Sequence, residues 1–241
     1  MRIKTEADRL LAMIRDGRTM SAGQKVRLAV MLSVPAVVAQ LSSIVMQYID
    51  ASMVGSLGAE ASAAIGLVST TTWLFGGLLS AAASGFSVQV AHRIGAGDWE
   101  GAQRVLRQSV VAVLAFSLLL ASIGAGISSS LPVWLGGAES IHRDASTYFL
   151  IISLFLPALQ MQFLAGGMLR CSGNMHVPSM AGVAMCALDV VFNFLLIFPS
   201  RTVAVAGFDV FLPGAGLGVE GAALGTVLAE TVVVAWLLWY L

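Results

Sequence analysis

Six long runs of apolar residues, separated by short polar connections, occupy most of this 241-residue chain. The runs cover residues 28–54, 61–90, 105–131, 148–169, 177–198 and 219–241. A helix needs about 20 apolar residues to cross the hydrocarbon core of a membrane, so each run can span it with some tilt. No linker divides residues 28–241. The pattern therefore predicts an all-α polytopic membrane protein whose six transmembrane helices form one unit.

The first 27 residues are mostly polar and basic, and no cleavage-like site follows them, so they are a leader and not a signal peptide. Five apolar residues would share one helical face if the leader were helical: Ile3, Ala7, Leu10, Leu11 and Ile14. Two interpretations stay open. The leader is either an amphipathic helix on the membrane surface that ends before Gly17, or an unstructured basic segment.

Charge is scarce and unevenly placed. Charged residues make up 11% of the chain and the net charge is zero, which gives no indication of a nucleic-acid partner. Seven Lys and Arg residues lie in the leader, three lie in or directly beside the connection between the second and third runs, and one follows the fourth, whereas two lie on the other side. Eleven against two predicts that both termini are cytoplasmic, in a multi-pass protein of the inner (plasma) membrane.

Two prolines lie inside the predicted spans and are expected to bend them: Pro35 in the first and Pro157 in the fourth. The chain stops at Leu241 directly after the last run, without a polar tail. That ending suggests a truncated chain. Cys171 and Cys186 are expected to be unreactive, because their positions fit neither a disulfide nor a metal site.

Two carboxylates inside the spans, Asp50 and Asp189, have no basic partner in any span. Such acids are costly in a bilayer and are functional candidates by default. Each lies on a polar helical face. These faces carry Gln40, Ser43, Gln47 and Asp50 in the first span, Asp189 and Asn193 in the fifth, and Ala222, Thr226 and Glu230 in the sixth.

Depth places several of these side chains together. With the first and fifth helices running outward and the sixth inward, Asp50, Asp189, Asn193 and Thr226 lie roughly 6 to 14 Å below the outer surface. Oxygen ligands of this kind suit Na⁺, whereas protonation of the acids would suit H⁺, and both interpretations stay open. A third is that the two acids are separate hydrogen-bonded packing residues. Gln40, Gln47 and Glu230 are candidates for lining a cavity, with packing as their alternative.

An enzymatic interpretation has little support. The segments 48–50, 95–98 and 157–159 imitate signals of intramembrane aspartyl proteases, but Ile49 interrupts the Tyr-Asp pair and Asp98 lies in a charged connection. Asp98 fits better as the cap of the helix that follows it. His92, His142 and His176 are scattered at span ends without metal spacing. We therefore expect no catalysis, no cofactor, and no metal beyond a possible Na⁺.

Several segments, in order and with similar spacing, resemble the multidrug and toxic compound extrusion (MATE) family of cation-coupled antiporters. They are residues 49–58, residues 88–98 with Ala102, and residues 170–174, 193–198 and 221–226. The resemblance implies that the chain is the N-terminal six-helix lobe of a twelve-helix fold, with a C-terminal lobe missing. It also implies a cation site formed by Asp50, Asp189, Asn193, the carbonyl of Ala222, and Thr226. The family more often has Asn at the position of Asp189 and Asp at that of Asn193.

The resemblance implies efflux of small organic, often cationic, drugs in exchange for Na⁺ or H⁺. Neutralisation of Asp50 and Asp189 by the ion would repack the first helix near Pro35 and favour drug release. A flippase for lipid-linked saccharides is an alternative, although it would be expected to have a more cationic cavity. A non-transporting half-length membrane fragment is another.

Overall fold

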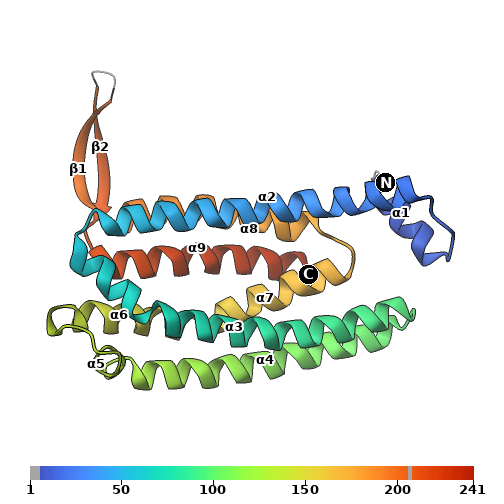
Figure 1. The fold of residues 1–241 in the computed structure, drawn as a ribbon, viewed down its shortest axis with the longest axis horizontal. Helices are drawn as coiled ribbons and strands as arrows, with labels where there is room; N and C mark the ends of the chain where they lie inside the picture. The colour runs from blue at the N-terminus through green and yellow to red at the C-terminus, as the bar shows by residue number, and fades with distance from the viewer. Residues whose placement is uncertain (1–5, 206–207) are drawn as a thin grey trace.

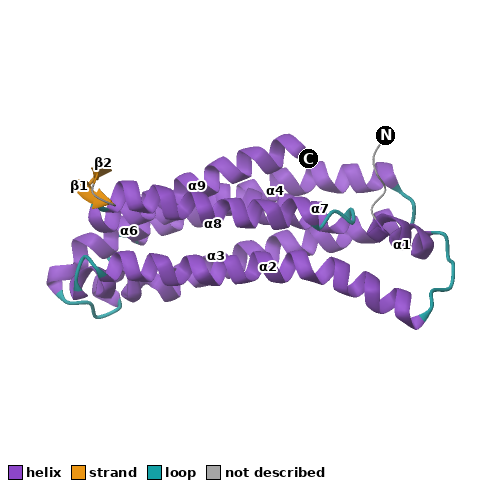
Figure 2. Cartoon of the chain, turned by 90° about the horizontal axis from the view of Figure 1, so that it is seen from above, coloured by secondary structure: helices purple, strands orange, loops and turns teal. Residues whose placement is uncertain are grey.

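The computed structural model describes residues 6–205 and 208–241, which form a bundle of long helices and one β-hairpin (Figure 1). The elements are α1 (Glu6–Arg15), α2 (Ala22–Gly55), α3 (Ala59–Gly95), α4 (Trp99–Ile127), α5 (Leu131–Trp134), the 3₁₀ helix η1 (Glu139–Ile141), α6 (His142–Leu154), α7 (Leu156–Cys171), α8 (His176–Ile197), β1 (Pro199–Val205), β2 (Phe208–Ala215) and α9 (Gly218–Tyr240). Figure 2 shows the same bundle turned by 90°, with the helices running side by side along its length.

Five of the helices, α2, α3, α4, α8 and α9, are long and apolar enough to cross a membrane individually. The described residues hold six spans when the stretch from η1 through α7, which is bent by 46°, is counted as one. The predicted fold class, an all-α membrane protein with six spans, is confirmed. The helices α2 and α3 have 34 and 37 residues, about 51 and 55 Å at 1.5 Å per residue. They are therefore longer than the roughly 30 Å of hydrocarbon that they cross.

Capping residues, not the start of the apolar run, decide where two helices begin. Ser21 and Gln24 form a reciprocal capping box, so α2 starts at Ala22, six residues before the apolar run at residue 28. The helix α4 starts at Trp99, also six residues before its run. At its other end the prediction was wrong, because α4 ends at Ile127 and residues 131–134 form the separate short helix α5.

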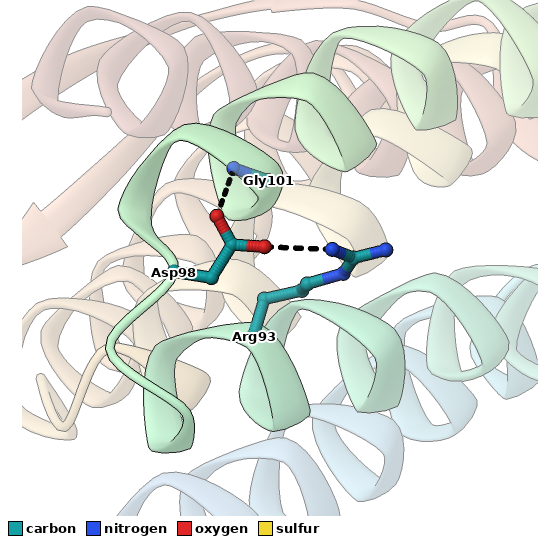
Figure 3. Close-up of polar contacts among 3 residues, drawn as sticks. All are labelled: Arg93, Asp98 and Gly101. Atoms are coloured by element: carbon teal, nitrogen blue, oxygen red, sulfur yellow. Dashed lines mark hydrogen bonds and ion pairs between the residues drawn. The ribbon is translucent and has the colours of Figure 1, made fainter.

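Asp98 caps α4, as the sequence predicts (Figure 3). Its Oδ1 accepts a hydrogen bond of 2.8 Å from the backbone N–H of Gly101, and its Oδ2 lies 2.6 Å from Nη1 of Arg93 at the end of α3. These two donors, the Arg93 guanidinium first, hold the pKa of Asp98 below its ordinary value of 3.8. One carboxylate therefore closes the turn between α3 and α4.

The fourth span is discontinuous. α6 ends at Leu154, and α7 begins at Leu156 with Pro157 in its first turn. Proline has no N–H to continue the hydrogen-bond ladder, so it is well placed at the start of a helix. The bend predicted at Pro157 is thus present. Pro35 differs, because α2 continues through it as one helix, and bending at Pro35 during transport stays a prediction.

The sequence pattern predicts only a connection between the fifth and sixth spans, whereas the structure has a hairpin there, formed by β1 and β2. It is antiparallel and projects from one end of the bundle, across the direction of the helices (Figure 1). The Arg201 guanidinium lies 4.9 Å from the ring centre of Phe194 and 4.7 Å from that of Phe198, which holds β1 to the end of α8. The two strands have 7 and 8 residues, which is too short for an apolar run that would indicate a transmembrane span.

The N-terminal leader contains the short helix α1, which packs against the start of α2. Leu10 is buried and Ile14 is exposed, and Glu6 forms an ion pair of 2.7 Å with Arg27 of α2. The chain leaves α1 through Gly17, whose positive φ of 66° suits glycine. Ile3, part of the predicted apolar face, lies outside the described residues. Whether α1 lies on a membrane surface stays a prediction.

Candidate functional site: two carboxylates bridged by an amide

Two glycines allow the backbones of α8 and α9 to touch. A Cβ atom at Gly221 would lie 2.5 Å from the carbonyl oxygen of Leu196, and one at Gly225 would lie 2.9 Å from the backbone nitrogen of Asn193. Glycines four residues apart are the usual means of close helix contact in membranes, where lipid provides no hydrophobic drive for association. This contact brings the polar face of α9 against Asp189 and Asn193.

Asn193 joins two acids that are distant in the sequence. Its side-chain Nδ2 donates a hydrogen bond of 3.0 Å to Oδ1 of Asp50 on α2 and another of 3.0 Å to Oδ2 of Asp189, one turn earlier on α8. Asp50 and Asn193 are 143 positions apart. The structure therefore brings together three of the residues that the sequence proposed for one site.

This cluster holds more hydrogen-bond acceptors than donors. Asp189 and Asn193 are 0% and 1% exposed, whereas Asp50 is half-buried. Oδ1 of Asp189 and Oδ1 of Asn193 are buried without a hydrogen-bond partner among the described residues. Buried polar atoms without partners are unfavourable, and an excess of acceptor oxygens is relieved by a proton or a cation.

Ala222 and Thr226 of α9 lie next to this cluster. The hydroxyl of Thr226 donates a hydrogen bond of 3.2 Å to the carbonyl of Ala222, one turn earlier on α9. Because that bond uses the hydroxyl proton, the oxygen of Thr226 is left as an acceptor. Both residues line the same cavity as Asp50 and Asn193.

The cavity has a volume of about 390 Å³ and lies between α2, α3, α6, α8 and α9. Its lining comprises Gln47, Asp50, Ala51, Val54, Ser62, Ile65, Gly66, Ser69, Thr72, Trp73, Tyr148, Asn193, Ala222 and Thr226. Sequence reasoning missed the contribution of α3. The spacing of Ser62, Gly66 and Ser69 already placed small and polar residues on one helical face, a pattern that could have identified it.

The other residues that the sequence proposed for the cation site or the cavity differ in whether they line this cavity. Asp189, fully buried one turn before Asn193 on α8, is not among the residues lining the cavity. Gln47 lines the cavity, whereas Gln40 is an exposed residue of α2 that does not. Glu230 is buried one turn beyond Thr226 and is not part of this lining, and its Oε1 has no hydrogen-bond partner among the residues that the structure describes. Gln40 and Glu230 therefore do not line this cavity, and a cavity-lining role for them stays a prediction.

The donor set distinguishes this site from a transition-metal centre. Within the described parts of the chain, no three His, Cys, Asp or Glu side chains are grouped so that they could hold a metal ion. Two carboxylates with amide, carbonyl and hydroxyl oxygens nearby form an environment for a hard monovalent cation or for a proton. The chemistry of the residues present thus fits both ions considered from the sequence.

Comparison with known proteins decides the family. The MatE family model matches residues 35–195, about two thirds of the chain. The chain belongs to the MatE family. A curated relative, the probable multidrug resistance protein NorM of Thermotoga maritima, is 22% identical over 201 residues, which are 83% of this chain and 41% of that protein. The resemblance to the MATE family seen in the sequence is confirmed.

Solved structures show the same fold. A transporter of the MOP superfamily from Pyrococcus furiosus, described as having a binding pocket of reverse polarity, matches with a TM-score of 0.77 at 23% identity and covers 98% of this chain and 47% of that one. A MATE protein in a straight conformation gives a TM-score of 0.75 at 25% identity over 88% of this chain and 44% of that one. This MatE chain therefore spans about half the length of the proteins it matches.

Proposed function

We propose that this MatE chain is one lobe of a multidrug efflux transporter that exchanges drug for Na⁺ or H⁺. The observation that carries the proposal is the Asn193 amide held between the carboxylates of Asp50 and Asp189 beside a cavity. Membership in a family with multidrug transporters supports efflux. The second lobe, which the half-length match to relatives implies, would complete the transport pathway.

The coupling ion would compete with the amide for the two acids. In the described arrangement the NH₂ group of Asn193 provides positive hydrogen atoms to both carboxylates, and its Oδ1 faces Gly225. A Na⁺ ion would be held by oxygens of Asp50, Asp189, Asn193, Ala222 and Thr226, which requires the amide to turn its oxygen inward. A proton would instead sit on a carboxyl group.

Drug binding would respond to this exchange through α2. Asp50 belongs to α2 and the other ligands belong to α8 and α9, so an ion that joins them changes how α2 packs. A coupled transporter needs its two ligands to prefer different states of the bundle. We infer that ion binding favours the state with lower affinity for a small organic, cationic drug, with repacking of α2 near Pro35.

The orientation follows from the distribution of basic residues. Most of the Lys and Arg residues lie in the leader and the start of α2, at the end of α3 and the start of α4, and at the end of α7. We propose that both termini are cytoplasmic in the inner membrane, which places the hairpin and the acid cavity toward the outside.

The test is drug efflux in everted membrane vesicles that contain the full-length protein. In Asp50→Asn the new side-chain oxygen can still accept from Asn193, so folding is retained while the charge is lost. Loss of the charged contact is expected to reduce ion-driven efflux by about tenfold or more. Glu60→Gln, an exposed acid in the first turn of α3, is the matched control and should transport normally.

Separate gradients identify the ion. A Na⁺ gradient at constant pH and a pH gradient without Na⁺ are imposed in turn on vesicles containing wild-type protein. The gradient that drives efflux names the coupling ion. Unchanged ion-driven efflux by Asp50→Asn, at equal amounts of protein in the membrane, would contradict the proposal.

A further inference from the structure

A second cavity of about 660 Å³ lies on α3 beyond the acid cavity, between α3 and α7. The acid cavity uses residues 62–73 of α3, and the second cavity uses residues 80–95. We call this second cavity the α3–α7 groove. Its lining comprises Ser80, Ala83, Ser84, Ser87, Val88, Ala91, His92, Gly95, Phe163, Gly167, Arg170 and Cys171.

The groove has the length of one membrane leaflet. Its residues on α3 recur every three or four positions from Ser80 to Gly95, so they form one stripe of about 22 Å at 1.5 Å per residue. A bilayer is about 40–45 Å thick with its headgroups, so a leaflet measures about 20–22 Å. Because Gly95 is the last residue of α3, the stripe runs from one end of that helix to near its middle, which in the proposed orientation is from the cytoplasmic side towards the midplane.

The groove's floor is a direct contact between the two helices. A Cβ atom at Gly167 would overlap the hydroxyl of Ser87 and lie 3.4 Å from the Cβ of that serine. The thiol of Cys171 donates a hydrogen bond of 3.1 Å to the backbone carbonyl of Ser87. The residues beside this contact have small side chains, so the space above them stays open and forms the groove.

The inner wall of the groove offers few free hydrogen-bonding groups to a ligand. The hydroxyl of Ser84 donates to the carbonyl of Ser80 at 2.8 Å, and that of Ser87 donates to the carbonyl of Ala83 at 2.9 Å. Serines bonded to their own helix in this way present little free donor capacity. With Phe163, Val88 and the alanines, the deep part of the groove suits an apolar chain.

The surface end of the groove is cationic. Arg170 and His92 line it there, and no Asp or Glu is part of the lining. The guanidinium of Arg170 lies over Gly166, 3.4 Å from where a Cβ atom would be, and forms no ion pair with any residue that the structure describes. Arg93, nearby in sequence, is by contrast engaged by Asp98.

We propose that the α3–α7 groove binds an anionic phospholipid, with its phosphate at Arg170 and His92 and one acyl chain along the stripe from Gly95 to Ser80. Basic residues at the cytoplasmic surface attract anionic lipids, and basic pockets between spans bind their headgroups. The matched length, the apolar depth and the cationic mouth together fit a lipid better than a free phosphate, which has no chain to fill the groove.

Native mass spectrometry of the purified full-length protein, titrated with dioleoyl-phosphatidylglycerol or dioleoyl-phosphatidylcholine, tests the proposal. Arg170→Gln is expected to lower the affinity for phosphatidylglycerol by about fivefold and to leave phosphatidylcholine nearly unchanged. Ser84→Leu fills the apolar stripe without altering charge, so it should weaken both lipids. Arg107→Gln, an exposed arginine of α4 outside the groove lining, is the control and should match wild type.

The outcomes separate the possible occupants. Loss of phosphatidylglycerol by Arg170→Gln with no effect of Ser84→Leu would indicate that the groove takes an anion without a chain, and would overturn the lipid proposal. Equal lipid binding by wild type and the three variants would also overturn it, and would indicate that the second lobe covers the groove. Because the measurement is made without transport, its failure is distinct from failure of the efflux proposal.

Discussion

Replacement of Gly225 by alanine tests whether the α8–α9 contact builds the site. The new Cβ would overlap the Asn193 side-chain oxygen and lie 2.9 Å from the Asn193 nitrogen and 3.0 Å from its Cγ. Ordinary van der Waals contact begins at 3.4 Å, so the backbones must separate by about half an ångström. That shift moves the amide that holds Asp50 and Asp189.

The magnitude follows from two opposed effects. Overpacking costs about 1–3 kcal/mol, and replacing a helical glycine by alanine recovers up to about 1 kcal/mol. The expected net loss of stability is therefore about 1–2 kcal/mol. Hydrogen bonds to charged groups contribute about 1.5–3 kcal/mol each, so displacement of one of the two Asn193 bonds should weaken ion binding by about tenfold or more.

The assay pairs thermal unfolding of the purified full-length protein with ion-dependent drug efflux. Gly124→Ala is the matched control, because its Cβ would lie 2.7 Å from the Cβ of Ser153 and 3.1 Å from the ring of Phe75, and none of these three residues lines the acid cavity. Gly126→Ala, where a Cβ meets nothing within 4 Å, reports helix propensity alone.

Both close-packed variants should lose stability, but only Gly225→Ala should also lose ion coupling. The reasoning fails if Gly225→Ala retains wild-type coupling while losing as much stability as Gly124→Ala. It fails equally if Gly225→Ala is as stable as Gly126→Ala.

Two further predictions concern the ends and the interior of the bundle. Because the pKa of Asp98 is lowered in the folded state, its charge stabilises the fold above pH 3.8, and this stabilisation is lost as the pH falls through the lowered pKa. The melting temperatures of wild type and Asp98→Asn should therefore differ at neutral pH and converge in acid. A difference that stays constant with pH would refute this. Gln160 is fully buried and donates a long hydrogen bond of 3.3 Å to the carbonyl of Leu79, and its Oε1 has no partner in the described part of the chain. Gln160→Met should therefore melt within a few degrees of wild type or above it, and a large loss of thermal stability would show that this amide is a structural anchor.

The hydrophobic pattern was sufficient to predict the six spans, because a bilayer admits few alternatives to helices of that length and composition. The hydrophobic pattern could not give the first residues of α2 and α4, because the N-terminal caps Ser21 and Asp98 let these helices begin before the apolar runs. It also missed the β-hairpin, whose strands are stabilised by pairing with each other outside the spans.

The candidate site was likewise predicted in part from the sequence and decided in part by the tertiary structure. The sequence by itself pointed to Asp50 and Asp189, because unpaired acids in apolar helices are rare and costly. It pointed to Asn193 because this residue lies one turn from Asp189 on the same helical face. Only the tertiary structure showed that the Asn193 amide lies between the two acids, since that depends on α2 meeting α8. The close approach at Gly225, the face that α3 gives to the cavity, and the position of Glu230 away from it were likewise decided by packing, because helical spacing gives the face of a residue but not the neighbour it meets.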